Sequence, residues 1–403
     1  MLCCNLFTVI FFLLVCTGTA QRASILQQNS AAPLLKWRFS VTAPIYSSPV
    51  TDGEAIYTGT CDSSFYAVDI LSGKLKWSFK TAGQIRSTAL LHGTHIYFIS
   101  GDGKLYCVSK EGKLIWAFAG KEKKYDFADY HQSSPIINNG TLYAGMGDGN
   151  LYALQAGSGQ VLWKFKTGGP IHNAAVTDGS TIYFGSFDGY VYGVGINTHT
   201  ARWKFKTVGH NYFPKGEVQG NPALINNTVV VGARDYNVYA LDKEKGFARW
   251  NKAYTRGWVL SASSRDSMLY LAGADERILT AIHTQTGIEK WKRTMELLMF
   301  GRPAFATDML YMGTTMGKLH AIDINTGEDK WVFATDGYTQ NHLKFFKEDD
   351  SYRDDIYAVI TSDEAFLAAQ EKIGGIFSTP LLYNNLLLFT STEGAIYCLK
   401  VSD

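Results

Sequence analysis

The chain has 403 residues, with 38 Lys and Arg against 36 Asp and Glu, so its formal net charge is only +2. No long run of one charge sign occurs, and this balance argues against a nucleic-acid partner, since nucleic-acid-binding domains carry a basic surface. Aromatic residues make up 14% of the chain, and they recur at regular positions, which indicates a role in the core and not in base stacking.

The first twenty residues are predicted to be a secretory signal peptide. An apolar segment over residues 6–16 is followed by small residues, with cleavage expected after Ala20. The segment is short for a membrane span and no later stretch rivals it, so we expect an exported, periplasmic or extracellular chain without a transmembrane segment. Cys16 raises the alternative of lipid attachment, but Val15 is larger than the residues that lipoprotein processing usually accepts before the cysteine.

Residues 21–34 are predicted to be a linker, and a tryptophan repeat begins directly after them. The intervals between successive tryptophans are 39 to 47 residues, which matches one four-stranded propeller blade of roughly 40 to 50 residues. Only Trp258 falls outside the series. The repeated residues are Trp37, Trp77, Trp116, Trp163, Trp203, Trp250, Trp291 and Trp331.

Each repeat has the pattern of an antiparallel four-stranded sheet. Residues 151–156 alternate in the period of two that is typical of a strand. Asp148-Gly149 before this strand and Ser158-Gly159 after it supply the positive φ angles that tight hairpins need. An earlier strand pair surrounds the turn at Asn139, so four strands are predicted for each repeat. This alternation also excludes helical repeats.

The two ends of the chain are expected to complete one blade together. The eighth repeat ends at Asp403 without a tryptophan strand, whereas residues 35–39 form a spare one at the N-terminus. Pairing them leaves no exposed sheet edge. We therefore predict an all-β, eight-bladed β-propeller of four-stranded antiparallel blades over residues 35–403, closed by the N-terminal strand. A β-sandwich fits the regular period less well. A solenoid would need distinct polar caps at both ends, whereas the two end segments here look like the two parts of one ordinary repeat.

The repeat resembles the PQQ-like propeller repeat over nearly the whole mature chain. GTTMGKLHAIDINTGEDKWVF, residues 313–333, keeps its AIDxxTGxxxW core. The resemblance implies the propeller fold and leaves the function open, because such propellers include quinone-dependent dehydrogenases and non-enzymatic scaffolds of the BamB type in outer-membrane assembly.

The resemblance implies that the dehydrogenases have a longer chain, an adjacent-cysteine disulfide and a Ca²⁺ held by acidic and amide side chains. Here the adjacent Cys3 and Cys4 lie in the signal peptide, and no such cluster occurs outside the repeat turns. We predict no catalytic residue, no metal site and no cofactor. The favoured function is a non-enzymatic exported scaffold, BamB-like in role, that binds a protein partner in the cell envelope or extracellular space and can be peripheral to the outer membrane. The alternative is a quinoprotein-like small-molecule-binding or redox protein that uses the channel mouth, and PQQ and calcium could bind only in that case.

The remaining chemistry-bearing residues are explained by the repeat. One acidic residue recurs at the same turn of seven repeats, where a carboxylate satisfies local backbone N–H groups. Cys107 and Cys398 occupy a small buried strand position, whereas Cys61 lies in a turn as a candidate free thiol. The histidines show no metal-binding spacing. The turn residues are Asp62, Asp102, Asp148, Asp188, Asp235, Glu276 and Glu393.

Three inserts interrupt the repeat, at residues 120–132, 208–219 and 336–377, and propeller connectivity predicts that they emerge on one face. Long loops of this kind tend to be functional. The third insert contains a predicted helix with Thr361 and Glu364 at capping-box spacing and an end at Gly374. The charged residues 345–355 before it are interpreted as a solvated loop or a mobile lid.

The residue before each inner strand is predicted to border the channel mouth on this face. Polar residues of blades two to five would form one wall, opposite an apolar wall from blades six to eight. Such a mouth is suited to an amphipathic ligand or a peptide segment, with Arg86 meeting a carboxylate or another anion. These mouth residues are Tyr46, Arg86, Gln132, His172, Gln219, Val259, Phe300 and Phe377.

Overall fold

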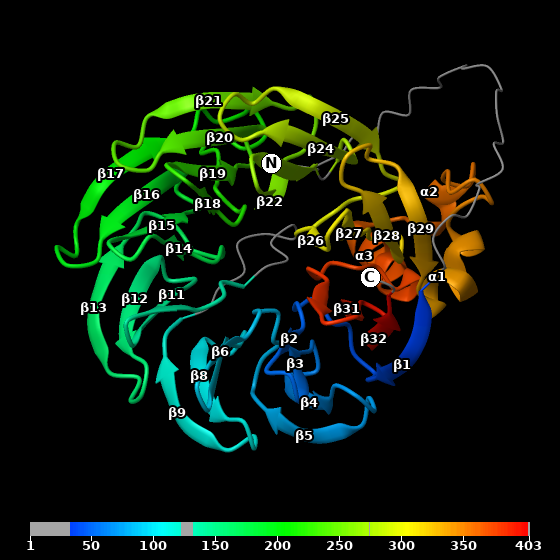
Figure 1. The fold of residues 1–403 in the computed structure, drawn as a ribbon, viewed down its shortest axis with the longest axis horizontal. Coiled ribbons are helices and arrows are strands. Elements are labelled where there is room, and N and C mark those ends of the chain that lie inside the picture. Colours follow the sequence, from blue (N-terminus) through cyan, green and yellow to red (C-terminus); the bar gives the residue numbers. More distant parts are fainter. Residues whose placement is uncertain (1–32, 122–131, 274, 402–403) are drawn as a thin grey trace, which may run out of the picture.

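The computed structural model describes residues 33–121, 132–273 and 275–401. They form eight four-stranded antiparallel sheets that surround a central axis as blades (Figure 1). The predicted eight-bladed propeller is confirmed. In blades one to four the strands, from the axis outward, are β2 (Val50–Thr51), β3 (Ala55–Gly59), β4 (Ser64–Asp69), β5 (Leu75–Lys80); β6 (Leu90–His92), β7 (His95–Ile99), β8 (Lys104–Ser109), β9 (Leu114–Ala119); β10 (Ile136–Asn138), β11 (Thr141–Gly145), β12 (Asn150–Gln155), β13 (Val161–Lys166); and β14 (Val176–Thr177), β15 (Thr181–Gly185), β16 (Tyr190–Gly195), β17 (Ala201–Lys206).

Blade eight takes its outer strand from the other end of the chain. β1 (Leu34–Ser40) pairs antiparallel with β32, joining Leu34 to Lys400 and Ser40 to Ala395, so the predicted closure is confirmed. The strand begins at Leu34, one residue before the predicted boundary, and residues 1–32 lie outside the described residues. Blades five to eight contain β18 (Ala223–Ile225), β19 (Thr228–Gly232), β20 (Asn237–Asp242), β21 (Ala248–Ala253); β22 (Val259–Arg265), β23 (Met268–Gly273), β24 (Ile278–His283), β25 (Glu289–Thr294); β26 (Ala304–Phe305), β27 (Met309–Gly313), β28 (Lys318–Asp323), β29 (Asp329–Ala334); and β30 (Leu381–Tyr383), β31 (Leu386–Ser391), β32 (Ala395–Lys400) with β1.

The repeated tryptophans join neighbouring blades. Trp116 in β9 donates its indole N–H to the carbonyl of Ala156 in the next blade, at 3.0 Å. Its ring covers Gly159, where φ is 72° and an added Cβ would lie 2.6 Å from the ring. In the described residues, six of the eight repeat tryptophans donate in this way, so the period of about 40 residues reflects a contact that recurs at most blade boundaries. At this boundary the glycine is required both by its φ angle and by the ring.

A second pair of side chains fills most blade boundaries. Two residues after the tryptophan, a phenylalanine packs near edge-on against a tyrosine in the third strand of the next blade. Their ring centroids are 4.9 to 5.9 Å apart. The pairs are Phe39–Tyr66, Phe79–Tyr106, Phe118–Tyr152, Phe165–Tyr192, Phe205–Tyr239 and Phe333–Tyr397.

Five of the seven repeated turn acids have the predicted structural role. Glu276 instead accepts from the backbone N–H groups of Thr255 and Arg256, outside its own turn, and Glu393 accepts from side-chain hydroxyls. Asp148 accepts from the backbone N–H of Asn150 at 3.0 Å and from the Tyr152 hydroxyl at 2.7 Å. Asp62, Asp102, Asp188 and Asp235 repeat both contacts with their own neighbours. The tyrosine four residues later was not anticipated, although its spacing is visible in the sequence.

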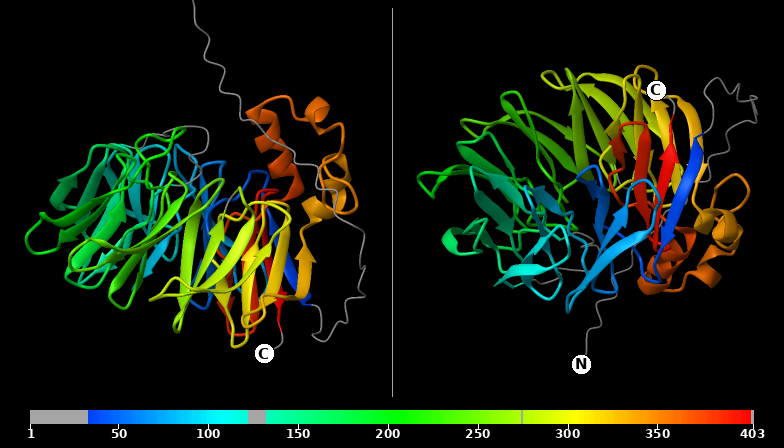
Figure 2. Two further views of the ribbon diagram at one scale, coloured as in Figure 1. Left: turned by 90° about the horizontal axis from the view of Figure 1, so that it is seen from above. Right: turned by 60° about the horizontal axis from the view of Figure 1, so that its bottom comes forward.

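The third insert forms a small helical unit that stands on one face of the ring (Figure 2). Its helices are α1 (Asp336–Asn341), η1 (His342–Lys344), α2 (Ile356–Val359) and α3 (Asp363–Ile373). The predicted helix corresponds to α3 and ends at Gly374, whose φ is 75°. The predicted start is wrong by one residue, because the Ser362 hydroxyl, and not that of Thr361, accepts from the N–H of Ala365.

The start of the charged segment is packed, so its interpretation as a solvated loop or lid is wrong there. Phe345 and Phe346 are 7% and 4% exposed and belong to an apolar cluster with Met316. Asp350 forms an ion pair with Lys318 of blade seven, which fastens the insert to the ring. Among the described residues, no helix is long and apolar enough to cross a membrane.

Candidate functional site

The apolar mouth residues form a closed cluster at the end of the axis that carries the insert. Phe377 stacks on Phe300 at 4.7 Å between ring centroids and meets Tyr46 edge-on at 4.9 Å. The three side chains are 3%, 7% and 9% exposed, respectively. They therefore fill this side of the mouth instead of presenting the open apolar wall that the sequence predicted.

Helix α3 covers this aromatic cluster. Leu367 packs against it, and the Tyr46 hydroxyl donates to Glu371 at 3.2 Å. Burial together with the Glu371 charge raises the pKa of Tyr46 well above its usual range. The third insert therefore closes the mouth on its apolar side.

Arg86 and Gln132 lie at the less enclosed part of the mouth. The Arg86 guanidinium carbon is 4.6 Å from the centre of the Tyr46 ring, a cation–π contact. The Gln132 side chain accepts from the Arg86 backbone N–H at 2.9 Å and so links blades two and three. Within the described part of the chain, no carboxylate lies within ion-pair distance of Arg86. Its charge also opposes the rise that burial causes in the pKa of the Cys61 thiol.

His172 and Gln219 are buried, each 1% exposed. The His172 ring meets Phe187 edge-on at 5.4 Å, and the Gln219 side-chain oxygen accepts from Arg234 Nε at 2.8 Å. The predicted wall of donors is therefore wrong for these two residues, because neighbouring side chains enclose them. Val259 is likewise buried, at the start of β22. The binding role assigned to the mouth residues stays a prediction.

Arg234 and Trp258 are mouth residues that the sequence analysis missed. Arg234 is fully buried, and its guanidinium carbon lies 5.0, 5.5 and 5.3 Å from the rings of Phe187, Phe213 and Trp258. This aromatic box holds the second insert, residues 208–219, against blades four to six. The signal in the sequence was Trp258, the one tryptophan outside the repeat.

At the boundary between blades six and seven, a buried ionic group replaces the repeated aromatic pair. His320 stands where other blades carry the tyrosine, and its two ring nitrogens lie 3.1 Å from Glu296 and 3.1 Å from Asp329. Arg293, at the phenylalanine position, binds Asp329 through two hydrogen bonds of 2.9 and 2.8 Å. Although burial alone would lower it, the two carboxylates raise the pKa of His320 to about 9.

This ionic group predicts a loss of stability at alkaline pH. The folded pKa of His320 exceeds its unfolded value of about 6.5, so its contribution is complete below pH 6.5 and disappears as the pH rises through 9. We expect the unfolding free energies of wild type and His320→Gln to differ by up to about 3 kcal/mol more at pH 6.5 than at pH 10. Urea unfolding of both proteins at the two pH values measures this. An unchanged difference would show that His320 is neutral throughout.

Almost the whole chain matches the profile of one known protein family. The profile of the family described as outer membrane protein assembly factor BamB matches residues 19–205 and 188–403, which include all eight blades. The chain belongs to the BamB family. BamB of Moranella endobia is 25% identical over 280 residues, 68% of this chain and 61% of that protein. The serine/threonine-protein kinase AfsK of Streptomyces griseus is 28% identical over 132 residues, 29% of this chain and 16% of the kinase. The aligned part thus spans less than two thirds of either relative.

Solved structures show the same fold. BamB from Moraxella catarrhalis superposes with a TM-score of 0.68 at 12% identity, covering 92% of this chain and 98% of that one. Quinohemoprotein alcohol dehydrogenase from Comamonas testosteroni gives a TM-score of 0.65 at 12% identity, covering 91% of this chain and 76% of that one. At this identity, likeness to either structure establishes the fold alone.

The mouth of this BamB-family chain does not fit a quinone with calcium. Within residues 33–121, 132–273 and 275–401, no three His, Cys, Asp or Glu side chains are grouped to hold a metal ion. The aromatic rings of Tyr46, Phe300 and Phe377 contact one another and α3 instead of flanking a planar guest. No catalytic step through such a group follows from these residues.

Proposed function

We propose that this chain is a non-enzymatic exported scaffold that binds a protein partner in the cell envelope or extracellular space. Membership of the BamB family supports a scaffold role in general. The mouth supports it as well, because Gln132, Gln219 and Tyr46 use their polar atoms in contacts within the protein. A tightly bound quinone is not expected.

The observation that carries the proposal is the exposure of large apolar side chains on two inserts. Both inserts connect an outer strand to the next inner strand, so propeller connectivity brings them out on the same face. Side chains of this size in water are typical of a protein-binding surface when they gather on one face. They are Val208 (76% exposed) and Tyr212 (69%) on the second insert, and Leu343 (52%), Tyr357 (57%) and Val359 (42%) on the third.

The two inserts are held firmly enough to act as a preformed interface. Phe213, next to Tyr212, lies against Trp258 at 5.2 Å between centroids and against Arg234. Lys318 and Tyr338 both bind Asp350 in the third insert. A preordered surface loses less conformational entropy on binding. Arg86, at the entrance between them, would pair with an acidic side chain or a carboxylate of the partner.

The test is crosslinking in the native envelope followed by measured binding. A photoreactive residue at position 212 or 343 is expected to capture a defined protein, whereas one at the rim position Leu114, which is 53% exposed, is not. With that purified protein, Tyr212→Ser plus Leu343→Ser should weaken binding about ten-fold or more. The matched control, Leu114→Ser plus Leu162→Ser, should not. Capture from the rim alone, or equal affinity of both double variants, would place the interface elsewhere.

A further inference from the structure

The boundary between blades five and six lacks the repeated aromatic pair. Lys252 in β21 occupies the phenylalanine position, opposite Val238, and Thr280 in β24 occupies the tyrosine position, opposite Lys292. One strand end is also altered. Tyr254 follows β21 where blades one, three and four carry the buried or half-buried hydroxyl of Thr81, Thr167 or Thr207. Three substitutions thus meet at a single boundary.

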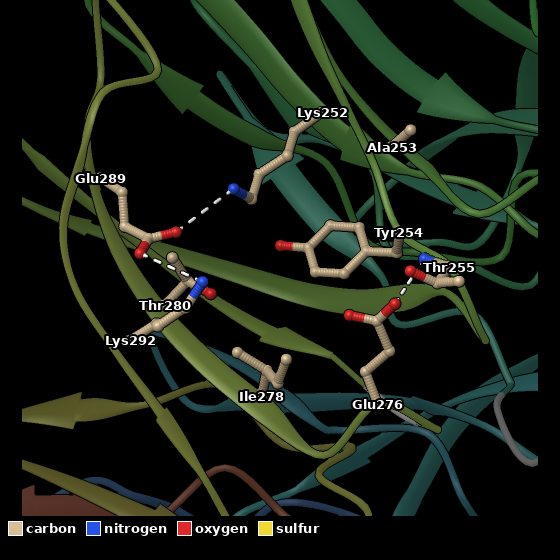
Figure 3. A pocket seen from close by; sticks show the side chains of 9 residues that line it. All are labelled: Lys252, Ala253, Tyr254, Thr255, Glu276, Ile278, Thr280, Glu289 and Lys292. Atoms are coloured by element: carbon tan, nitrogen blue, oxygen red, sulfur yellow. Dashed lines mark hydrogen bonds and ion pairs between the residues drawn. The ribbon is translucent and has the colours of Figure 1, made fainter.

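A cavity of about 110 Å³ lies at this boundary (Figure 3). It is several times larger than the roughly 10–15 Å³ that one buried water requires, so it has room for a compact guest of several non-hydrogen atoms. Thr280, 1% exposed, is smaller than the tyrosine found there in six blades, which accounts for the space. The lining residues are Lys252, Ala253, Tyr254, Thr255, Glu276, Ile278, Thr280, Glu289 and Lys292.

The two ends of the cavity carry opposite charge. At one end, Lys252 and Lys292 share the single carboxylate of Glu289, at 3.5 and 3.7 Å, which leaves this end one positive charge in excess. At the other end, Glu276 accepts from the backbone N–H groups of Thr255 and Arg256 through one oxygen only. Figure 3 shows its second oxygen turned toward the cavity.

Tyr254 lies between these ends. Its hydroxyl is buried and makes no hydrogen bond of standard geometry with the described residues, although the Thr280 side chain lies close to it. Such a group costs free energy unless water or a guest supplies a partner. Figure 3 shows the ring between Lys252 and Glu276 with the hydroxyl pointing toward the lysine end. The cavity therefore offers a phenolic donor beside the ammonium groups and an aromatic edge near the carboxylate.

We propose that this cavity is a binding site for a small zwitterion of the amino-acid or betaine class. The guest's carboxylate pairs with Lys252, Lys292 and the Tyr254 hydroxyl, and its cationic nitrogen pairs with the Glu276 carboxylate. A simple anion would pair with the lysines but would leave the Glu276 carboxylate without a cation. A simple amine would pair with Glu276 but would leave the excess positive charge of the lysines without an anion. The site lies between two blades and does not depend on the partner-binding role proposed for the insert face.

Calorimetric titration with alanine and glycine betaine tests the proposal, with acetate and ethylamine as single-charge controls. We expect saturable binding of at least one zwitterion, at least about ten-fold tighter than either control, because each control loses one charged contact worth about 1.4 kcal/mol or more. Binding of acetate as tight as that of both zwitterions, or saturation by none of the four, would overturn the assignment.

Two variants locate the site. Thr280→Tyr restores the residue of six other blades and fills the cavity, so it should abolish zwitterion binding without lowering the melting temperature. Thr326→Tyr adds the same side chain at an exposed turn of blade seven and should bind as wild type does. Glu276→Gln should weaken zwitterion binding about ten-fold while leaving acetate binding unchanged or stronger. Undiminished zwitterion binding by both Thr280→Tyr and Glu276→Gln would place the site elsewhere and refute the proposal.

Discussion

Removing residues 21–40 is expected to lower the melting temperature of the propeller by about 10 °C or more. The deletion takes away β1, which supplies the outer strand of blade eight. Trp37 donates to the carbonyl of Ile70 at 3.0 Å, and Phe39 packs on Tyr66, so blade one also loses these two contacts with blade eight. Loss of a packed tryptophan and phenylalanine costs about 3 to 5 kcal/mol each, a large part of the stability of a domain.

A truncation of residues 21–32 is the matched control, because it leaves β1 complete. Its melting temperature should equal that of the full mature chain. Trp37→Ala should account for a substantial part of the effect of the longer deletion, since it removes the ring that covers Gly73. If the two truncations melted within a degree or two of each other in calorimetry, strand closure would contribute little, and the ring would be held by the remaining blade contacts.

Arg234→Ala is expected to destabilise the protein by about 3 kcal/mol or more, a cost of the size found when a large buried side chain is deleted. The change leaves Gln219 Oε1 without its donor and opens a cavity among Phe187, Phe213 and Trp258. Because Phe213 belongs to the second insert, residues 208–219 should also exchange amide hydrogens faster.

Chemical unfolding and hydrogen exchange measure these two effects. Arg234→Lys should recover only part of the stability, because an ammonium group lacks the planar face that stacks between aromatic rings. Arg256→Ala, at an exposed arginine on the neighbouring connection, is the control and should stay within about 0.5 kcal/mol of wild type. An Arg234→Ala protein as stable as this control would mean that the aromatic box closes around the missing side chain without cost.

The sequence by itself determined the architecture. The tryptophan period, the Asp-Gly and Ser-Gly turns and the unmatched strand at the N-terminus predicted eight blades and their closure, and the structure confirms them. These features are predictable because seven blades are built entirely from strands adjacent in the chain, and most boundaries repeat the same few contacts. The turn acids of blades one to five were interpreted correctly for the same reason: their partners lie two to four residues away.

Only the tertiary structure decided which mouth residues are exposed. Lining up the repeats predicted that eight residues lie at the same end of the axis. In the structure, however, α3 covers Tyr46, Phe300 and Phe377, and Arg234 binds the side chain of Gln219. The cavity at Lys252 and Thr280 likewise depends on residues 28 positions apart in different blades. Burial and charge pairing at these sites depend on neighbours distant in sequence, whose packing no local pattern encodes.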